Sequence, residues 1–409
     1  MTRANPGRGR STASGRRFEA RPAGGTTDPR SNRRPGRDAG ARGSGGGGGE
    51  GRATVVELTF LPGLGDVVAA EIDEVLRPAK PAAPAPGRDD ALVVTLQGPL
   101  ADVRRLRTAV AAFVSLHFDV PRPKSLVSGE HLPRIVDAVY ASLRVAGSSS
   151  FRFEAAGSDS AVFARLAQEL RQATGLKYDE RDGELVVRVR RGPRRGDADP
   201  GWDVLVRVGP RPLSARAWRV ADYPGAVNAT IAAAMVRLGG VRDDQRVINL
   251  CCGSGTLLIE RLLAGPAAAA LGLDTSDDAL AIAADNTEAA GLKRAVRLTR
   301  ADATAPTKWP TPAAPSAAPG DDGWDLVLAD PPWGGLHGSH ADAERLHGGL
   351  LTAAHKRTAD GARFVVLTHE VKVMQRCLRA AAGQWRVADE VRVFAKGHHP
   401  RIWVLDRVG

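Results

Sequence analysis

The apolar positions from Val220 to the end of the chain form short runs that alternate with longer segments of helical spacing. Such runs indicate strands that are buried on both faces, and the segments between them indicate covering helices. The pattern predicts an α/β fold with a mostly parallel sheet wrapped on both sides. Only the turn 395–400 separates the last two strands, so they must pair as an antiparallel hairpin. The seven predicted strands are 246–250, 270–274, 296–302, 324–330, 362–368, 385–394 and 401–407, and a helix at 226–238 precedes them.

The first half of the chain mixes strands and helices without this regular alternation, which is typical of α+β structure. Arginines recur on its strands, and this pattern suits either a surface that lines RNA or a solvated face; the sequence leaves both open. Those arginines are Arg152, Arg188, Arg190 and Arg207. Predicted strands are 54–62, 91–96, 151–156, 184–190 and 203–209, and predicted helices are 63–76, 101–115, 132–144 and 160–174, with a Pro/Ala linker at 78–87.

Composition divides the chain further. Residues 1–52 carry twelve arginines against four acidic residues, so they hold most of the net charge of +11, and their Gly/Arg-rich sequence cannot bury a core. A basic tail attracts polyanions, although a solvated extension without a partner has the same composition. The predicted divisions are a disordered tail at 1–52, an α+β domain at 53–125, a second at 126–215 and the α/β domain at 216–409. A Pro/Ala-rich insertion at 305–322 is expected to be a disordered surface loop.

Several classes of protein are disfavoured. No apolar stretch is long enough to span a membrane, and no N-terminal signal segment is visible, so a soluble cytoplasmic protein is expected. The three cysteines have no metal-ligand spacing, and no metal site is predicted.

A Gly-rich turn joins the first strand of the α/β domain to a helix, in the segment V-I-N-L-C-C-G-S-G-T (247–256). Gly253 and Gly255 allow a ligand to approach the main chain at the start of that helix. Leu258 stands where a nicotinamide-binding fingerprint has a third small residue, which disfavours a dinucleotide. Asp274, nineteen residues after Gly255, ends the next strand and can accept hydrogen bonds from ribose hydroxyls; Asp302 ends the third, where it can meet an adenine edge.

The fourth strand ends in D-P-P-W, which comprises Asp330, Pro331, Pro332 and Trp333. The prolines stiffen the turn and donate no backbone hydrogen bond, so carbonyls can face a substrate. Acceptors on Asp330 and Pro331 would bind the hydrogens of an exocyclic amino group and make its nitrogen a better nucleophile. Trp333 would stack an extruded base. The four residues are therefore candidate catalytic residues for transfer to an amino nitrogen.

These motifs make residues 220–409 resemble the RNA methyltransferases of the class I, Rossmann-like superfamily. The segments before them resemble the ferredoxin-like and THUMP domains of tRNA guanine-N2-methyltransferases, whose opening is similar to F-L-P-G-L-G (60–65). The resemblance implies S-adenosylmethionine (SAM) as cofactor, tRNA as the RNA partner and THUMP contacts with the tRNA acceptor end. Asn249 stands where the family commonly has an acid that contacts the cofactor. The implied cofactor residues are Asn249, Cys251, Gly253, Ser254, Gly255, Thr256, Asp274 and Asp302.

Other chemistries fit the sequence less well. Pyrimidine C5 methylation needs a thiolate beside the base, and Cys251, Cys252 and Cys377 are poorly placed for it. Ribose methylation usually involves a lysine-containing constellation that is not evident. The alternatives that stay open are guanine-N2 methylation of 23S rRNA, adenine-N6 methylation of DNA, glutamine methylation of protein, and RNA binding without catalysis. A monomer is expected.

Overall fold

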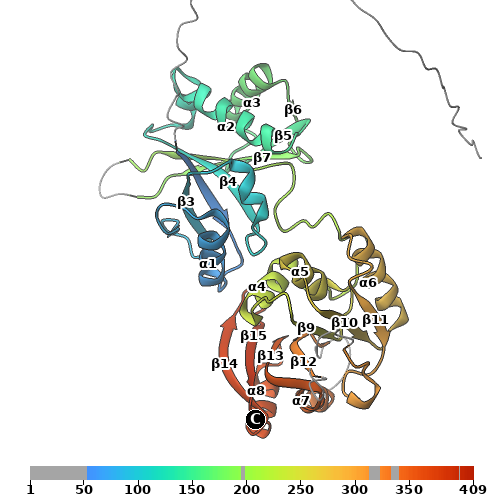
Figure 1. Ribbon diagram of the computed structural model, residues 1–409. Helices are drawn as coiled ribbons and strands as arrows, with labels where there is room; N and C mark the ends of the chain where they lie inside the picture. The colour runs from blue at the N-terminus through green and yellow to red at the C-terminus, as the bar shows by residue number, and fades with distance from the viewer. Residues whose placement is uncertain (1–52, 195–198, 313–322, 333–339, 396) are drawn as a thin grey trace, which may run out of the picture. The chain divides into compact units, whose positions relative to one another are not determined.

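A computed structural model describes residues 53–194, 199–312, 323–332, 340–395 and 397–409 (Figure 1). The predicted basic tail at 1–52 and the predicted catalytic Trp333 lie outside these residues. Within them, the strands form two sheets, one from each half of the chain. No helix among these residues has both the length and the apolar character needed to cross a bilayer.

The N-terminal sheet contains eight strands among the described residues, in the order β2-β3-β1-β4-β8-β7-β5-β6. Its helices pack on one face, where their apolar side chains share a core with alternate residues of the strands. The sheet is continuous because β4 pairs antiparallel with β8, so the predicted segments 53–125 and 126–215 contribute to one sheet. The strands are β1 Thr54–Thr59, β2 Ala83–Pro84, β3 Ala91–Leu96, β4 Ala111–Phe118, β5 Ser150–Glu154, β6 Lys177–Tyr178, β7 Leu185–Arg191 and β8 Trp202–Arg207. The helices are α1 Gly65–Leu76, η1 Leu100–Arg105, η2 Pro123–Val127, α2 His131–Val145 and α3 Ala161–Thr174.

The helix predicted at 101–115 is wrong. A short 3-10 helix, η1, occupies residues 101–105, and residues 106–110 belong to neither a helix nor a strand. Residues 111–115 belong to β4, which pairs with both β1 and β8 in the middle of the sheet. The Ala-rich sequence has good helix propensity, but propensity is a weak determinant when two neighbouring strands offer hydrogen bonds and burial. Residues 111–114 are all buried. Tertiary pairing therefore decided this segment.

The C-terminal sheet has seven strands within the described residues, in the order β11-β10-β9-β12-β13-β15-β14. β11, β10, β9, β12 and β13 are parallel, whereas β15 is antiparallel to β13 and β14. The structure confirms the predicted α/β fold, including the final antiparallel hairpin. The strands are β9 Arg246–Leu250, β10 Ala269–Asp274, β11 Arg297–Arg300, β12 Trp324–Ala329, β13 Thr358–Thr368, β14 Trp385–Arg392 and β15 Arg401–Arg407. The helices are α4 Ala229–Gly239, α5 Thr256–Ala264, α6 Asp277–Ala289, η3 Pro306–Lys308, α7 His340–Arg357 and α8 Val371–Ala380.

Helices cover both faces of the C-terminal sheet, which explains why its central strands β9, β12 and β13 are largely buried, whereas the edge strands β11 and β14 are mostly exposed. Figure 1 shows α4 and α5 on one side of the central strands and α7 and α8 on the other. Every residue of β9 is buried: Val247 packs in the core on the α4 and α5 side, and Ile248 and Leu250 pack with α7 and α8. Polar side chains that must remain accessible are therefore confined to the strand ends, where parallel sheets bind ligands.

The insertion at 305–322 is not a surface loop in its first part. η3 begins it, and Trp309 is only 3% exposed and packs into the core beneath α7 and α8. The Arg357 guanidinium donates a hydrogen bond of 3.2 Å to the Trp309 carbonyl. Residues 313–322 lie outside the described part of the chain. The Pro/Ala-rich composition suggested a loop, but the one large apolar side chain of Trp309 anchors the segment in the core.

Candidate cofactor and substrate site

A cavity of about 730 Å³ opens at the carboxyl ends of the parallel strands of the C-terminal sheet. Its walls come from the turns after β9, β10 and β12, the segment after β11, the residues before α4 and one residue of α7. Parallel α/β sheets bind ligands at this edge because successive turns meet there. Most of the predicted site residues line the cavity: Cys251, Gly253, Ser254, Thr256, Asp274, Asp302, Asp330 and Pro332.

The Gly-rich turn after β9 has the backbone conformation that the sequence predicts. Gly253 has φ of +51° and Gly255 has φ of +77°, and both lie in the left-handed region that favours glycine. A Cβ atom on Gly255 would lie 3.3 Å from the Ala283 Cβ, so α6 also requires a small residue here. Cys251 has φ of +52°, an uncommon conformation for a residue with a side chain. The turn therefore brings the main chain to the cavity, and α5 begins at the cavity wall.

Asp274 connects two walls of the cavity. One carboxylate oxygen accepts a hydrogen bond of 2.9 Å from the Gly253 amide, and the other accepts one of 3.0 Å from the Ser276 amide. A carboxylate oxygen has two acceptor positions, so each can accept another hydrogen bond from a ligand. Asp274 thus shapes the Gly-rich turn and presents acceptors to the cavity.

Asp302 is exposed at the cavity, and its side chain also organises the chain that follows. One oxygen accepts hydrogen bonds from the amide and the hydroxyl of Thr304, at 2.8 and 2.7 Å. Its backbone carbonyl accepts a bond from the Ala305 amide. Ala301 and Ala303 on either side are buried. The segment offers a flat apolar wall beside one carboxylate, which suits an aromatic ring with polar edges.

The D-P-P-W motif is described only up to Pro332. Asp330 is half-buried and Pro332 is exposed, and both line the cavity, whereas Pro331 is buried between them. Trp333 lies outside the described residues. The structure therefore brings the turns after β9 and β12 to the same cavity, as the sequence predicts.

The pKa of the Cys251 thiol reflects the negative charge around this cavity. Burial, and then the carboxylates of Asp274, Asp330 and Asp302, raise the pKa of this thiol to about 12. Cys251 is therefore protonated at neutral pH and cannot serve as a thiolate nucleophile. The same three carboxylates give the cavity a negative potential that favours a positively charged ligand.

Asn249, Gly255 and Pro331 do not line the cavity. Asn249 is fully buried, and its amide nitrogen donates to the carbonyls of Leu328 and Leu250, at 3.1 and 3.2 Å. The bond to Leu328 ties β9 to β12 immediately before the Gly-rich turn, whereas Leu250 is the next residue of β9 itself. A direct cofactor contact by Asn249 stays a prediction.

The residues before α4 form a wall that sequence reasoning missed. This segment runs from Tyr223 to Val227, and burial and the Asp274 carboxylate raise the pKa of the Tyr223 phenol. A Cβ on Gly253 would lie 3.6 Å from the Tyr223 ring, so the ring lies directly against the Gly-rich turn. The available signal was the Y-P-G turn before the helix cap Asn228, whose side chain accepts the Thr230 amide. Leu346 of α7 was also missed.

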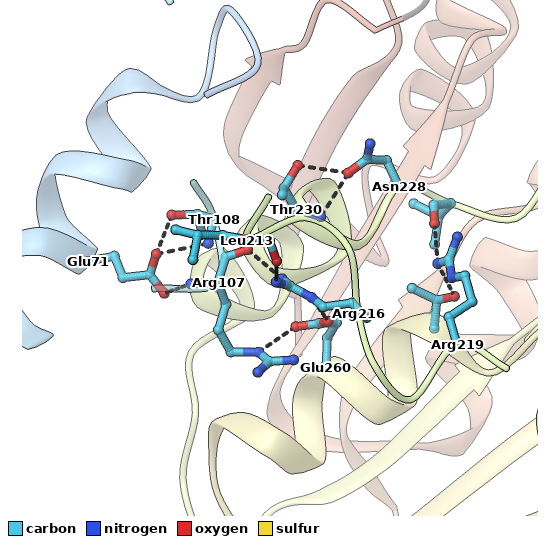
Figure 2. Close-up of polar contacts among 11 residues, drawn as sticks. Glu71, Arg107, Thr108, Leu213, Arg216, Arg219, Asn228, Thr230 and Glu260 are labelled. Carbon is cyan, nitrogen blue, oxygen red and sulfur yellow. Dashed lines mark hydrogen bonds and ion pairs between the residues drawn. The ribbon is translucent and has the colours of Figure 1, made fainter. Parts of the chain in front are cut away.

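A buried polar network lies behind the Gly-rich turn and links it to the N-terminal half (Figure 2). The Glu260 carboxylate on α5 is fully buried and pairs with Arg216 at 2.8 Å and Arg107 at 2.6 Å. The Arg219 guanidinium donates a bond of 2.9 Å to the hydroxyl of Thr256, the first residue of α5. The Thr256 hydroxyl in turn lies 3.0 Å from that of Ser254. Side chains from three segments therefore hold the base of the cavity.

Glu71 on α1 anchors the N-terminal end of this network. Its carboxylate accepts the backbone amides of Arg107 and Thr108, at 3.0 and 2.9 Å, and the Thr108 hydroxyl as well (Figure 2). The Arg107 carbonyl accepts a bond of 2.6 Å from Arg216. Charged residues this far apart in the sequence form no periodic pattern, so only the structure reveals that they pair.

Comparisons with known proteins agree with this geometry. Residues 216–401 match the family model described as "UPF0020: RMKL-like, methyltransferase domain". A tRNA (guanine(6)-N2)-methyltransferase of Thermus thermophilus is 29% identical over 64% of this chain and 74% of the relative. A tRNA (guanine(6)-N2)-methyltransferase of Methanocaldococcus jannaschii is 24% identical, and the match covers 47% of this chain and 57% of the relative. The crystal structure of TrmN from Thermus thermophilus has a TM-score of 0.65 and 25% identity, over 87% of this chain and all of that one (100%).

These comparisons show the Rossmann-like fold of the class I methyltransferases in this chain. They also extend beyond the C-terminal domain, because the similarity to TrmN includes most of the N-terminal half. Among the described residues, no group of side chains has the composition of a metal site.

Proposed function

We propose that this chain is a SAM-dependent methyltransferase that methylates the exocyclic N2 amino group of a guanine in tRNA. One observation supports the proposal above all: the Gly-rich turn with Asp274 and the turn that begins with Asp330 line the same cavity. The first is the type of site that binds a nucleoside, and the second is the type that binds an amino group. The similarity to relatives named tRNA (guanine(6)-N2)-methyltransferase supports the same substrate.

The residues of the cavity fit SAM. A volume of about 730 Å³ lies within the range of small-molecule sites. Asp274 offers acceptors to the ribose hydroxyls, and Ala301 and Ala303 flank the wall where an adenine ring would lie. Three carboxylates around Cys251 favour a cationic sulfonium. When bound, SAM supplies an activated methyl group, so the protein needs mainly to bind and orient the reactants.

The turn after β12 prepares the acceptor nitrogen. In this proposal the Asp330 carboxylate accepts a hydrogen bond from one amino hydrogen, and the predicted acceptor for the other is the carbonyl of Pro331, a buried residue that does not itself line the cavity. Hydrogen bonds to the amino hydrogens localise the nitrogen lone pair away from the purine ring. Bound SAM would supply its methyl group to the nitrogen lone pair that these acceptors orient, and the amino proton that is released would pass to water. Pro331 has no amide hydrogen that could compete for these acceptors. Trp333 completes the motif as a stacking surface for the base.

The state of the cysteines supports transfer to nitrogen rather than to a pyrimidine carbon. Attack on the pyrimidine ring requires a thiolate, and the raised pKa of Cys251 keeps that thiol protonated. Burial, and then the Asp274 carboxylate and the Cys251 thiol, raise the pKa of Cys252 even further. Cys377 lies on α8, where burial raises the thiol pKa and its sulfur donates to the Glu344 carbonyl.

The N-terminal half binds the RNA in this proposal. Segments 53–125 and 126–215 act as the ferredoxin-like and THUMP-like parts of an RNA-binding region, and the Arg-rich residues 1–52 add sequence-independent attraction to phosphates. The protein acts as a monomer in the cytoplasm. The buried network around Glu260 connects the RNA-binding region to the helix that follows the Gly-rich turn.

The decisive experiment incubates the full chain with methyl-labelled SAM and, separately, bulk tRNA, ribosomal RNA, duplex DNA and a glutamine-containing peptide. We expect label in tRNA only, recovered as N2-methylguanosine by mass spectrometry of the nucleosides. Label confined to ribosomal RNA, DNA or peptide would overturn the substrate and identify the corresponding alternative. No label in any arm, with SAM bound, would indicate a protein that binds RNA without catalysis.

A further inference from the structure

A group of aromatic side chains lies at the cavity edge of the C-terminal sheet, outside the cavity walls. Ala329, the last residue of β12, pairs with Val366 of β13, so Asp330 and the residues after Thr368 leave the sheet at the same edge. β15 runs the other way, and its first residue, Arg401, pairs with Thr368. The turn between β14 and β15 therefore lies at the edge that carries Asp330.

Four rings gather on this turn and on the end of β13. The rings of His369 and His398 are 5.2 Å apart and nearly perpendicular, and those of Phe394 and His399 are 4.8 Å apart and tilted. Phe394 is 41% exposed, and His398 and His399 are exposed as well. We call these four residues the ring turn. Large exposed rings are uncommon on soluble surfaces and often mark contacts with a partner.

The backbone holds the ring turn in place. The Ala395 and His398 amides donate to each other's carbonyls, at 3.0 and 2.9 Å, and Gly397 provides the φ of +80° that the tight turn needs. The Phe394 amide donates a bond of 3.0 Å to the Pro62 carbonyl, from the segment F-L-P-G-L-G. The exposed rings therefore belong to a backbone with defined hydrogen bonds.

Gly63 shows how closely this contact is fitted. Its φ is +95°, and a Cβ atom there would lie 1.8 Å from the carbonyl oxygen of Arg392, so no other residue fits without moving the backbone. The loop before α1 thus packs main chain to main chain against the end of β14. The ring turn is held between the N-terminal region and the edge of the active site.

The chemistry of the rings suits unpaired nucleotides. Burial and the neighbouring His398 lower the pKa of His369 to about 4, so its imidazole is neutral at physiological pH and offers a flat π face. Unpaired bases stack on Phe and His rings with little dependence on sequence, and this stacking contributes about 1–3 kcal/mol per base. A base whose amino group is methylated must leave its helical stack, which exposes its neighbours as well.

We propose that the ring turn is a stacking platform for an unpaired RNA nucleotide adjacent to the methylated guanosine. The inference rests on the proposed function, because it places RNA at the Asp330 edge. It assigns Phe394 and His399 as the principal stacking pair and His369 and His398 as their support. The ring turn holds the RNA strand open while the target base occupies the cavity.

The test compares Phe394→Ala and His399→Ala with wild type, with Phe394→Tyr as the variant that preserves a ring. Val387→Ala is the matched control, because Val387 is 45% exposed on β14 but pairs with Leu405, away from the turn. We expect Phe394→Ala to raise the KM for tRNA about tenfold, as loss of one stacked base predicts. The Kd for SAM should stay unchanged, Phe394→Tyr should restore the KM, and Val387→Ala should match wild type. A KM unchanged in both Phe394→Ala and His399→Ala overturns the inference.

A binding measurement separates this inference from the proposed function. The probe is a single-stranded RNA oligonucleotide that contains 2-aminopurine, whose fluorescence falls when the base stacks. Wild type should quench it and Phe394→Ala should quench it several-fold less, whether or not methyl transfer is detected. Equal quenching by both proteins contradicts the ring turn, whereas quenching without methylation of any RNA contradicts only the proposed function. Thermal unfolding of each variant identifies a folding defect, and His399→Ala then carries the test.

Discussion

In the C-terminal sheet the carboxylates of the cavity lie at or just after the carboxyl ends of strands, whereas in the N-terminal sheet charged residues belong to the strands themselves. Asp274, Asp302 and Asp330 meet at one edge and raise the pKa of the same thiol. In the N-terminal sheet, Arg190 pairs with Glu57 at 2.6 Å, and Arg188 pairs with Glu154 at 2.8 Å. The charges at the converging strand ends line a cavity, whereas these charges within strands pair with each other.

The strand arginines of the N-terminal sheet therefore have structural partners. Arg188 lies over the Phe113 ring, with its guanidinium carbon 4.7 Å from the ring centre. Arg207 is buried and donates to the carbonyls of Glu184, Gly209 and Pro210, and burial lowers its pKa to about 10. The sequence left a solvated face and an RNA-lining face open. The pairs identify a third possibility, in which the arginines link different strands of the sheet: Arg188 links β7 to its neighbour β5, and Arg190 links β7 to β1.

The largest effect is expected at Asp330, and it distinguishes a carboxylate that acts on the substrate from one that binds the cofactor. Asp330→Ala should lower kcat about 10³-fold, at the upper end of the effect of removing one hydrogen-bonding group at the reacting atoms. The Kd for SAM, measured by calorimetry, should change little, because the role proposed for Asp330 is at the amino group of the substrate. Asp330→Asn keeps one acceptor oxygen and should retain part of the activity. A parallel loss of SAM binding in Asp330→Ala would assign this residue to the cofactor instead.

The next effect concerns a charge that is fully buried. Glu260→Gln removes the carboxylate shared by Arg216 and Arg107 and should lower the free energy of unfolding by about 3 kcal/mol, because two guanidinium groups lose their counterion. Urea denaturation measures the change. Glu74→Gln is the matched control, since Glu74 pairs with Arg237 across the same two halves of the chain but is 70% exposed. Equal loss in both variants would show that burial of Glu260 is not the cause.

A smaller effect tests the double role of Asp274. Asp274→Ala removes the acceptor for the Gly253 and Ser276 amides and the acceptors offered to the ribose. SAM binding should weaken about tenfold to a hundredfold, and Asp274→Asn, which keeps one acceptor, should lie between this variant and wild type. Isothermal titration calorimetry with SAM provides the Kd. Wild-type affinity in Asp274→Ala would remove this carboxylate from the cofactor site.

The smallest effect is expected within the N-terminal sheet. Arg188→Gln breaks a pair in which Arg188 is 27% and Glu154 is 38% exposed, so the unfolding free energy should fall by no more than about 1 kcal/mol. The salt dependence of tRNA binding should keep its slope, because a paired arginine neutralises no phosphate. Filter binding at several salt concentrations measures that slope. A shallower slope would show that Arg188 contacts the RNA. The charges of the N-terminal strands would then not serve only to pair with each other.

Much of the C-terminal domain could be predicted because its local signals agree. Apolar runs bounded by turns located β9, β10, β12 and β15 to within a residue, since strands buried on both faces tolerate few polar side chains. The N-terminal half was harder, and β4 was predicted as helix because its pairing partners are distant in the sequence. Trp309 was assigned to a loop for a similar reason: only the core beneath α7 and α8 shows why that ring is buried.

By itself, the sequence determined the order of the strands along the C-terminal half, the Gly-rich turn and the D-P-P motif, because periodicity and backbone restriction act over a few residues. Only the tertiary structure decided which polar groups meet. It placed Tyr223 against Gly253, enclosed Glu260 between two arginines and brought Phe394 beside the loop at Pro62. These contacts join residues far apart in the chain, and their energies depend on burial and distance, which no local pattern encodes.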